Sequence, residues 1–278
     1  MGFLNEIWRL IAGHNALSTF FYMFLTASAI NVFLAVFFRS RKIQPKGFKW
    51  KTYRNEIAFG LINVFTSGLL IGGGTAFLTS HGLIKVNTAP ASWWIIALEY
   101  GFYFIAYDTW FYWMHRLMHK EPVYTLVHKI HHKSTSPNLL TTFSVGPLES
   151  VVNGGFIPLF TAVVTVHSQS LALMTLSAGL IGIYIHSGYE FMPRWWNRTW
   201  ATKWFITATF HDQHHKYFNW NYGGYTTNWD RICGTTRKKY EADFVKLKDR
   251  AASAKAGEAG ASGQISTGQP AAGQLEPV

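Results

Sequence analysis

Eight of the twelve histidines in this 278-residue chain fall into three short runs. Residues 115–119 read HRLMH, residues 128–132 read HKIHH and residues 211–215 read HDQHH, so the pattern H-x-x-H-H occurs twice. Side chains three or four residues apart share one face of a helix, so each run can direct several imidazoles to one place. Imidazole is a ligand for zinc, copper, iron and nickel. The spacing therefore predicts metal binding.

The number of histidines indicates two metal ions. A structural zinc site takes four ligands, whereas the three runs hold eight histidines and His186 closes a nearby apolar segment. Because an H-x-x-H-H run places its first histidine on the same face as the last two, one run can reach two neighbouring ions, each with about four nitrogens. We expect His14, His81 and His167 to be surface or capping residues. Cys233 is the only cysteine, which excludes an internal disulfide and a cysteine-based metal site.

Long apolar segments must position these runs. The segments Leu17 to Phe38, Ile57 to Leu78 and Ser92 to Trp113 are each long enough to cross a bilayer as a helix. Val151 to Val166 and Leu171 to Ile185 are shorter, and they form either two thin spans or a hairpin that dips into the bilayer. We expect an all-α integral membrane helical bundle, with about four transmembrane helices or three plus a hairpin, and a cytosolic histidine-rich cap.

The distribution of charge predicts the orientation. The net charge is +11, yet only 14% of the residues are charged, which is well below the usual quarter. Seven basic residues lie between positions 39 and 54, whereas the linker after the second span has only Lys85. The positive-inside rule places residues 39–55 in the cytoplasm, and every histidine run then falls on that side. Because the basic residues follow the membrane topology, we expect no nucleic-acid partner.

The three runs in this order, followed by NYGGYTTNWDRICGT at residues 221–235, resemble the fatty acid hydroxylase and sterol desaturase superfamily. The resemblance covers roughly residues 95–240. It implies a membrane enzyme of the endoplasmic reticulum or the bacterial inner membrane that hydroxylates or desaturates a sterol or an acyl lipid. It also implies two iron ions, O₂ as co-substrate, and electrons from a ferredoxin or cytochrome b5-like donor with its reductase; zinc can replace iron in purified protein. Sterol, fatty acid, sphingoid base and ornithine lipid all stay open as substrates.

The resemblance makes nine histidines iron ligands by position. They are His115, His119, His128, His131, His132, His186, His211, His214 and His215. Two departures from the family pattern affect the assignment. Fatty acid 2-hydroxylases of the superfamily have a further histidine where this chain has Gly182, which weakens a 2-hydroxylase assignment. In the middle loop, GPLE places Gly146 where many relatives have a histidine, and this leaves the role of Glu149 open.

Three carboxylates are candidates for orienting the histidines. Asp108 lies seven residues before His115, on the same helical face, and a carboxylate within a span is usually functional. Its expected role is either a hydrogen bond to a ligand imidazole or a structural bond to a neighbouring helix. Glu190 and Asp230 flank ligand segments and could orient histidines, whereas we expect Asp212 to face solvent.

The chain divides into an N-terminal transmembrane region at 1–94, a catalytic domain at 95–245 and a tail at 246–278. From position 251 the composition turns to Ala, Gly, Ser and Gln, so we expect the tail to be disordered. The sequence has no flavin, haem or Rossmann signature, and we therefore expect the electrons to come from a separate protein. Two other interpretations stay open. A metal transporter predicts ligands deep within the spans, and a non-catalytic metal-binding scaffold gives no reason for two identical triplets.

Overall fold

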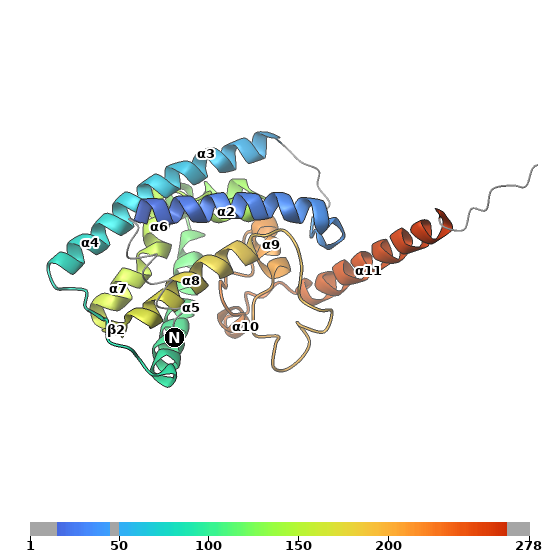
Figure 1. Ribbon diagram of the computed structural model, residues 1–278. Coiled ribbons are helices and arrows are strands. Elements are labelled where there is room, and N and C mark those ends of the chain that lie inside the picture. Colours follow the sequence, from blue (N-terminus) through green and yellow to red (C-terminus); the bar gives the residue numbers. More distant parts are fainter. Residues whose placement is uncertain (1–15, 45–49, 266–278) are drawn as a thin grey trace, which may run out of the picture.

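The computed structural model describes residues 16–44 and 50–265 and is mostly helical (Figure 1). The α-helices are α2 (Ala16–Phe37), α3 (Trp50–Ser67), α4 (Gly73–Ser80), α5 (Trp93–Met118), α6 (Pro147–Gly154), α7 (Phe156–Val163), α8 (Ser168–Ile185), α9 (Ala208–Tyr217), α10 (Asn228–Ile232) and α11 (Tyr240–Ile265). Shorter helical turns are η1 (Arg39–Arg41), η2 (Gly68–Gly72), η3 (Tyr124–His128), η4 (His131–Lys133) and η5 (Leu139–Thr142). Strands β1 (Val86–Asn87) and β2 (Val166–His167) pair in parallel. The predicted helical fold is confirmed, apart from this small strand pair.

In the described part of the chain, two helices are long and apolar enough to cross a membrane. They are the continuous helix Trp50–Ser80, which joins α3, η2 and α4, and Ser168–Ile185, which is α8. Both match segments that the sequence predicts to be apolar helices. Helix α2 has 22 residues, and its part Phe21–Phe37 is apolar. Within the described residues α5 is not among the candidate spans although it has 26 residues, because its tyrosines, tryptophans and two carboxylates lower its hydropathy.

The predicted segment 151–166 is not one helix. It divides into α6 and α7, each eight residues long, on either side of Gly155. Eight residues of helix measure about 12 Å, which is less than half of the hydrocarbon core. Neither helix crosses a bilayer alone, so the number of spans predicted from the sequence stays a prediction.

Large apolar side chains on the long helices point outward. Phe37 on α2, Phe65 on α3 and Ile105 on α5 are each more than 60% exposed. So many exposed large apolar side chains are unusual on a water-soluble monomer and mark contact with a membrane or a partner. Together with the two candidate spans, the outer surface is that of a membrane protein.

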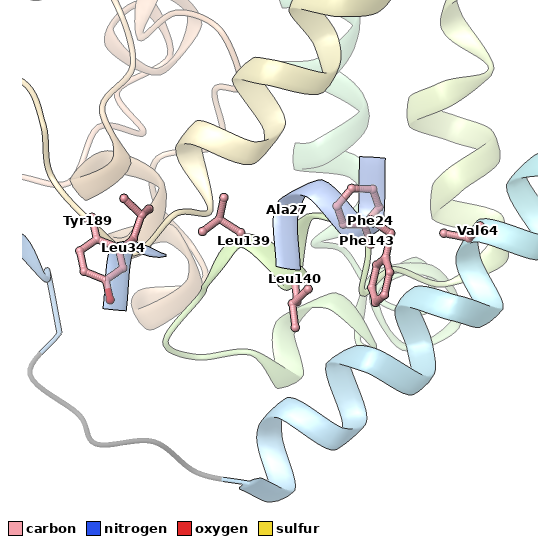
Figure 2. Packing of buried hydrophobic residues seen from close by; sticks show 8 residues of the cluster. All are labelled: Phe24, Ala27, Leu34, Val64, Leu139, Leu140, Phe143 and Tyr189. Atoms are coloured by element: carbon pink, nitrogen blue, oxygen red, sulfur yellow. The ribbon is translucent and has the colours of Figure 1, made fainter. Parts of the chain in front are cut away.

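Three clusters of buried side chains hold the helices together. In the first cluster, Phe24 of α2 meets Phe143 edge to face, with 5.6 Å between the ring centroids, and Val64 of α3 packs nearby (Figure 2). The second cluster joins α5, α7 and α8, and the third joins α8, α9 and α11. The first two fix the long helices against each other, and the third fixes α9, which carries one H-x-x-H-H run.

The predicted disordered tail is wrong for most of its length. Residues 240–265 form α11, and residues 266–278 lie outside the described part of the chain. Phe244, Val245 and Leu247 are buried, and Phe244 belongs to the third cluster. Packing of these side chains anchors the second turn of the helix, and alanine and lysine, which favour helix, continue it. The composition of the tail did not indicate the anchor because the buried side chains precede position 251.

Candidate metal centre

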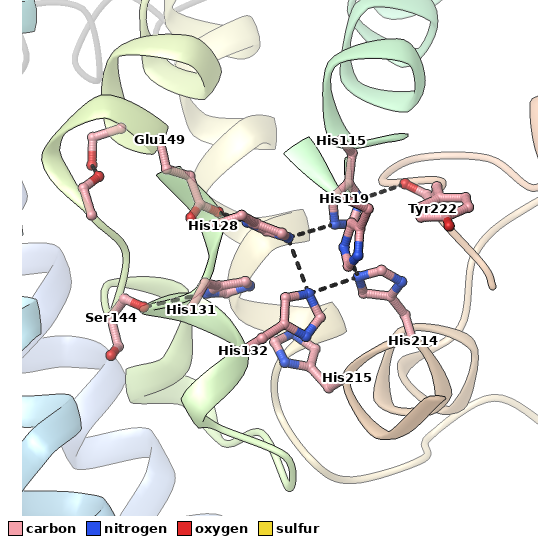
Figure 3. A network of polar contacts seen from close by, with 12 residues as sticks. His115, His119, His128, His131, His132, Ser144, Glu149, His214, His215 and Tyr222 are labelled. Atoms are coloured by element: carbon pink, nitrogen blue, oxygen red, sulfur yellow. Dashed lines mark hydrogen bonds and ion pairs between the residues drawn. The ribbon is translucent and has the colours of Figure 1, made fainter. Parts of the chain in front are cut away.

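The nine histidines that the sequence singles out lie together in two adjacent groups. The first histidine group consists of His115, His119, His128, His132 and His214. The second histidine group consists of His131, His186, His211 and His215. Within each group the ligand nitrogens all lie within 4.8 Å of one another. Figure 3 shows the imidazoles of the first group pointing toward a common point, with His131 and His215 beside them.

Each H-x-x-H-H run is divided between the two groups. Its first and last histidines, four residues apart, enter one group, and the histidine between them enters the other. His128 and His132 thus belong to the first group and His131 to the second, whereas His211 and His215 belong to the second and His214 to the first. The spacing predicts that one run can reach two ions, and the structure adds which histidine joins which group. The run HKIHH is less regular than expected, since it passes from the π-helical turn η3 through a turn into the 3-10 turn η4.

The elements that carry these histidines end at the site. His115 lies in the last turn of α5 and His119 is its C-cap, while His186 is the C-cap of α8. The run 211–215 lies on α9, whose N-cap Thr207 accepts a hydrogen bond from the backbone N–H of Phe210 at 3.1 Å. Three separate helices therefore deliver imidazoles to one region beyond the ends of the long helices.

The spacing of the nitrogens fits bound ions. Metal–imidazole bonds of about 2.1 Å at angles of about 90–110° place neighbouring nitrogens about 3.0–3.4 Å apart. In the first group the Nε2–Nε2 distances are 3.1 Å for His115–His128, 3.0 Å for His128–His132, 3.1 Å for His132–His214 and 3.1 Å for His119–His214. In the second group they are 3.2 Å for His131–His186, 2.9 Å for His186–His211 and 3.2 Å for His211–His215. The donor sets therefore fit one ion each.

Burial keeps these imidazoles neutral. Eight of the nine histidines are buried, and His119 is partly exposed. Desolvation lowers the pKa of His119 to about 2 and the pKa values of His211 and His214 well below the ordinary range, and neighbouring imidazoles lower them further. A neutral imidazole keeps a lone pair for a metal. Burying many imidazoles costs free energy unless their nitrogens bind a partner. A metal ion would be such a partner.

The outer nitrogens of six imidazoles have partners that fix their orientation. Nδ1 donates to the carbonyls of Tyr222 for His115, Ser144 for His131, Gly182 for His186, Trp220 for His214 and Ser134 for His215. Nδ1 of His128 instead lies within ion-pair distance of a carboxylate oxygen of Glu149, without the geometry of a hydrogen bond. Such contacts fix the tautomer, so that Nε2 presents its lone pair to the ion. Gly182, where a ligand histidine is missing, thus contributes through its carbonyl.

Glu149 is the carboxylate that faces an imidazole. Its Oε1 lies 2.9 Å from Nδ1 of His128, and both side chains are 2% exposed. Its Oε2 has no hydrogen-bond partner in the described part of the chain. Burial raises the pKa of Glu149 well above its ordinary value, and a metal ion bound to His128 would favour the ionised form. The sequence leaves the role of this residue open, and the geometry makes it the orienting partner of His128.

Asp108 does not contact an imidazole, so its predicted direct role is wrong. Seven residues of helix measure about 10 Å along the axis, which is more than an aspartate reaches. Its carboxylate instead accepts hydrogen bonds from the backbone N–H of Thr226 at 2.8 Å and its hydroxyl at 2.6 Å. The alternative, a structural bond, is the one observed, but it holds a loop rather than a helix.

Asp230 secures the same loop from its other end. It accepts hydrogen bonds from the backbone N–H groups of Tyr222 at 2.8 Å and Gly223 at 2.6 Å. The carbonyl of Tyr222 in turn accepts a hydrogen bond from Nδ1 of His115 at 2.7 Å. A side chain at Gly223 would collide with the carbonyl oxygen of Thr226, which explains glycine at this turn. Asp230 therefore orients His115 through the backbone.

Glu190 and Asp212 brace α9. Glu190 accepts hydrogen bonds from the N–H of Thr209 at 2.9 Å and its hydroxyl at 2.7 Å, in the first turn of this helix. Asp212 was expected to face solvent, but it is 3% exposed and accepts a hydrogen bond from Nε2 of Gln44 at 3.0 Å. The expectation failed because Gln44 is 168 residues away in the sequence, and no local pattern indicates the contact.

Sequence reasoning also missed Glu56. This residue of α3 is 2% exposed and accepts hydrogen bonds from the hydroxyl of Ser134 at 2.6 Å, the amide of Asn138 at 2.5 Å and the hydroxyl of Thr141 at 3.0 Å. The carbonyl of Ser134 accepts from Nδ1 of His215. The position of Glu56, a charged residue near the start of an apolar helix, could have indicated a buried role. The same position is equally typical of a residue at the membrane interface.

His81 and His167 take no part in either group. His167 contacts Glu99, with 2.8 Å between Nδ1 and Oε1, and His81 contacts the carbonyl of Phe77 at 2.9 Å. Their positions agree with the surface or capping roles that the sequence predicts for them. His14 lies outside the described residues.

The helical membrane-type bundle and the paired histidine groups define a class: membrane proteins with a histidine site suited to two metal ions. Comparison with known proteins makes the assignment specific. The family described as fatty acid hydroxylase matches residues 100–235, a range that holds all nine histidines. The chain belongs to this family.

Several curated relatives are similar over most of the chain. Methylsterol monooxygenase 1 of Danio rerio is 32% identical over 77% of this chain and 73% of its own length. Methylsterol monooxygenase erg25A of Aspergillus fumigatus is 35% identical over 52% of this chain and 50% of its own length. Delta(7)-sterol 5(6)-desaturase of Leptosphaeria maculans is 25% identical over 81% of this chain and 60% of its own length. No solved structure matches the chain.

Proposed function

We propose that the protein is a membrane-bound, O₂-dependent di-iron oxidoreductase that hydroxylates or desaturates a C–H bond of a sterol or an acyl lipid. The observation that carries this proposal is the presence of two adjacent groups of buried, neutral imidazoles. Rings of the two groups come as close as 4.9 Å between centroids, for His132 and His215. That proximity suits a pair of ions acting on one substrate.

The residues fit an iron pair, and their roles follow from the contacts. The first histidine group would hold one ion and the second histidine group the other. A bound iron pair would supply, with O₂, an oxidant strong enough to attack an unactivated C–H bond. Glu149 and the backbone carbonyls hold the imidazoles in the orientation that ligation needs. Because α5 and α8 end at the site, a lipid chain would reach it without leaving the bilayer entirely.

The reaction needs reducing equivalents from outside the chain. Hydroxylation consumes R–H, O₂, two electrons and two protons and gives R–OH and water. Desaturation consumes the same co-reactants, removes two hydrogens from adjacent carbons and gives an alkene and two waters. Both outcomes fit the relatives, whose names include sterol monooxygenases and a sterol desaturase. We infer a sterol or acyl-lipid substrate and a ferredoxin or cytochrome b5-like donor.

The site does not favour transport. A transit site requires ligands along a path through the membrane, whereas the histidines of both groups lie at the ends of α5 and α8 or beyond them. Both groups also have more ligands than a transient site needs, because release of an ion becomes slow as ligands are added. The oxidoreductase is therefore the function best supported.

The proposal is tested with His131→Ala and the matched control His81→Ala. We expect about two irons per wild-type chain, fewer in His131→Ala, and an unchanged content in His81→Ala. Lipid profiles of cells grown under ¹⁸O₂ should contain a product that is absent from His131→Ala cells. Label in the lipid would identify hydroxylation, and a new double bond without label would identify desaturation. A His131→Ala protein that keeps full activity would contradict the proposal.

A further inference from the structure

A hollow opens on the outer side of α9, opposite the histidines. Its volume is about 610 Å³, and α9 and α11 form much of its wall. Asp212, Gln213 and Lys216 of α9 line it, together with Lys246 and Arg250 of α11. In Figure 1 these two helices lie at the end of the molecule away from α4, α7 and β2. On the predicted topology this end faces the cytoplasm.

The hollow and the metal site use opposite faces of one helix. Positions 209, 212, 213 and 216 line the hollow, a spacing that follows one side of a helix. Positions 211, 214 and 215 carry the histidines. A helix with its side chains is about 10–12 Å across. A molecule seated in the hollow would therefore be separated from both histidine groups by little more than the thickness of α9.

The lining of the hollow has more basic than acidic side chains, since Lys216, Lys246 and Arg250 face Asp212 and Asp243. Asp243 forms an ion pair with Arg237 at 2.6 Å, and Asp212 accepts a hydrogen bond from the neutral amide of Gln44. Lys216 and Lys246 are exposed and form no ion pair with an acidic side chain in the described part of the chain. Unpaired cations around a concave surface attract acidic partners and accelerate their encounter.

We propose that this hollow between α9 and α11 is the docking site of the acidic electron-donor protein. The inference rests on the proposed function, which requires a donor. Each encounter would oxidise one single-electron carrier, so two encounters supply the two electrons of one turnover. Electron-transfer complexes are characteristically small and transient, and a compact surface that carries Lys216, Lys246 and Arg250 around an apolar floor matches that type of contact.

The test compares Lys246→Glu with Lys85→Glu. Both change one exposed lysine to glutamate, but Lys85 lies between α4 and β1, away from α9 and α11. Lys246 is also remote in sequence from every histidine ligand. Turnover is measured with a cytochrome b5 and with a plant-type ferredoxin, each with its reductase, and separately with dithionite as chemical reductant. Binding of each oxidised donor is measured by calorimetry.

At low ionic strength Lys246→Glu should raise the KM and the Kd of the productive donor by about tenfold, as expected for loss of steering and a like-charge contact. The iron content and the dithionite-driven rate should equal those of the wild type, and added salt should reduce the difference. Lys85→Glu should behave as the wild type. Equal donor KM and Kd for the two variants would overturn the docking site.

Two further outcomes are distinguishable. The measurements are repeated in neutral detergent and in vesicles containing phosphatidylserine. An effect of Lys246→Glu that occurs only in the anionic vesicles would assign the surface to lipid headgroups and overturn donor docking. A wild-type protein that holds iron but oxidises no lipid with any reductant would contradict the proposed function instead, and the calorimetric comparison would still decide whether an acidic carrier binds at this surface.

Discussion

His128 differs from the other candidate ligands because its outer nitrogen meets a carboxylate, whereas five others meet backbone carbonyls. A carboxylate raises the basicity of an imidazole ligand more than a neutral carbonyl does. The contact also gives Glu149 a reason to be buried, which is otherwise unfavourable for an acidic side chain. At the scale of single residues, we therefore expect metal binding by the first histidine group to depend most strongly on the pair of His128 and Glu149.

We expect Glu149→Ala to reduce metal affinity or activity by about 10–100-fold, the usual effect of removing an outer partner of a ligand histidine. Glu149→Gln keeps an acceptor oxygen but no charge, so its loss should be smaller. Iron content after dialysis against a graded series of chelator concentrations measures the effect. Glu241→Gln, at an exposed position, is the control. Iron retention by Glu149→Ala equal to that of the control would exclude the proposed contact.

The ligand candidates were predictable from sequence because histidine spacing encodes a helical face directly. The residues that orient them were predictable only in part. Asp108 was a candidate as a carboxylate within a span and Asp230 as a neighbour of a ligand segment, but both bond to a loop instead of to an imidazole. Glu56 and Gln44 act across 78 and 168 positions, and no local pattern carries such a contact. Sequence reasoning thus found the candidate ligands and missed many of the residues that hold them in place.

At the scale of elements, the N-terminal helices support the site from outside the matched family region. Through Glu56, α3 holds the loop that follows η4, and that loop supplies the carbonyl that orients His215. Gln44, just after η1, bonds α9 through Asp212 and the same loop through the carbonyl of Thr135. The second histidine group therefore depends on elements outside residues 100–235.

Glu56→Ala should destabilise the protein and lower its iron content, because it loosens the loop that orients His215. Three donors would lose their acceptor, and each unsatisfied buried donor costs about 1–3 kcal/mol, so we expect a loss of at least about 2 kcal/mol. Thermal unfolding in detergent and iron stoichiometry measure the two effects. Asn55→Ala, the adjacent and less buried position, should change neither. A Glu56→Ala protein with normal stability and two irons would contradict this role.

Element boundaries were harder to predict than element existence. The apolar segments at 57–78 and 171–185 became long helices, but 151–166 broke at glycine into two short ones. There a side chain at Gly155 would collide with the carbonyl of Val151. Composition suggested a disordered end, whereas packing of Phe244 anchors α11. In both cases a few local contacts determined the structure, and the amino-acid composition of the segment did not predict it.

At the scale of the whole molecule, the two ends differ in chemistry. The histidine groups lie at the ends of α5 and α8 and on α9, and the β1–β2 pair lies before α5 and α8 begin. Both helices therefore run from the strand end to the metal end. With the charge bias of the linkers, this arrangement predicts that the metal end is cytoplasmic.

Cys233 offers a direct test of orientation, because it is the only cysteine and lies partly exposed at the C-cap of α10. A membrane-impermeant maleimide should label Cys233 in inside-out vesicles and not in right-side-out vesicles. The variant Lys85→Cys in a Cys233→Ser background should give the opposite pattern. Labelling of Cys233 from the outer face of intact vesicles would reverse the predicted topology.

The interleaving of the two H-x-x-H-H runs has a consequence for assembly. A shift of either run displaces nitrogens of both groups at once, because each run contributes to both. Binding of the first ion by the apoprotein would therefore also position the ligands of the other histidine group, so metal uptake should be cooperative. Singly loaded chains would then be scarce at any metal concentration, and a growing culture short of iron would hold a mixture of fully charged and empty molecules.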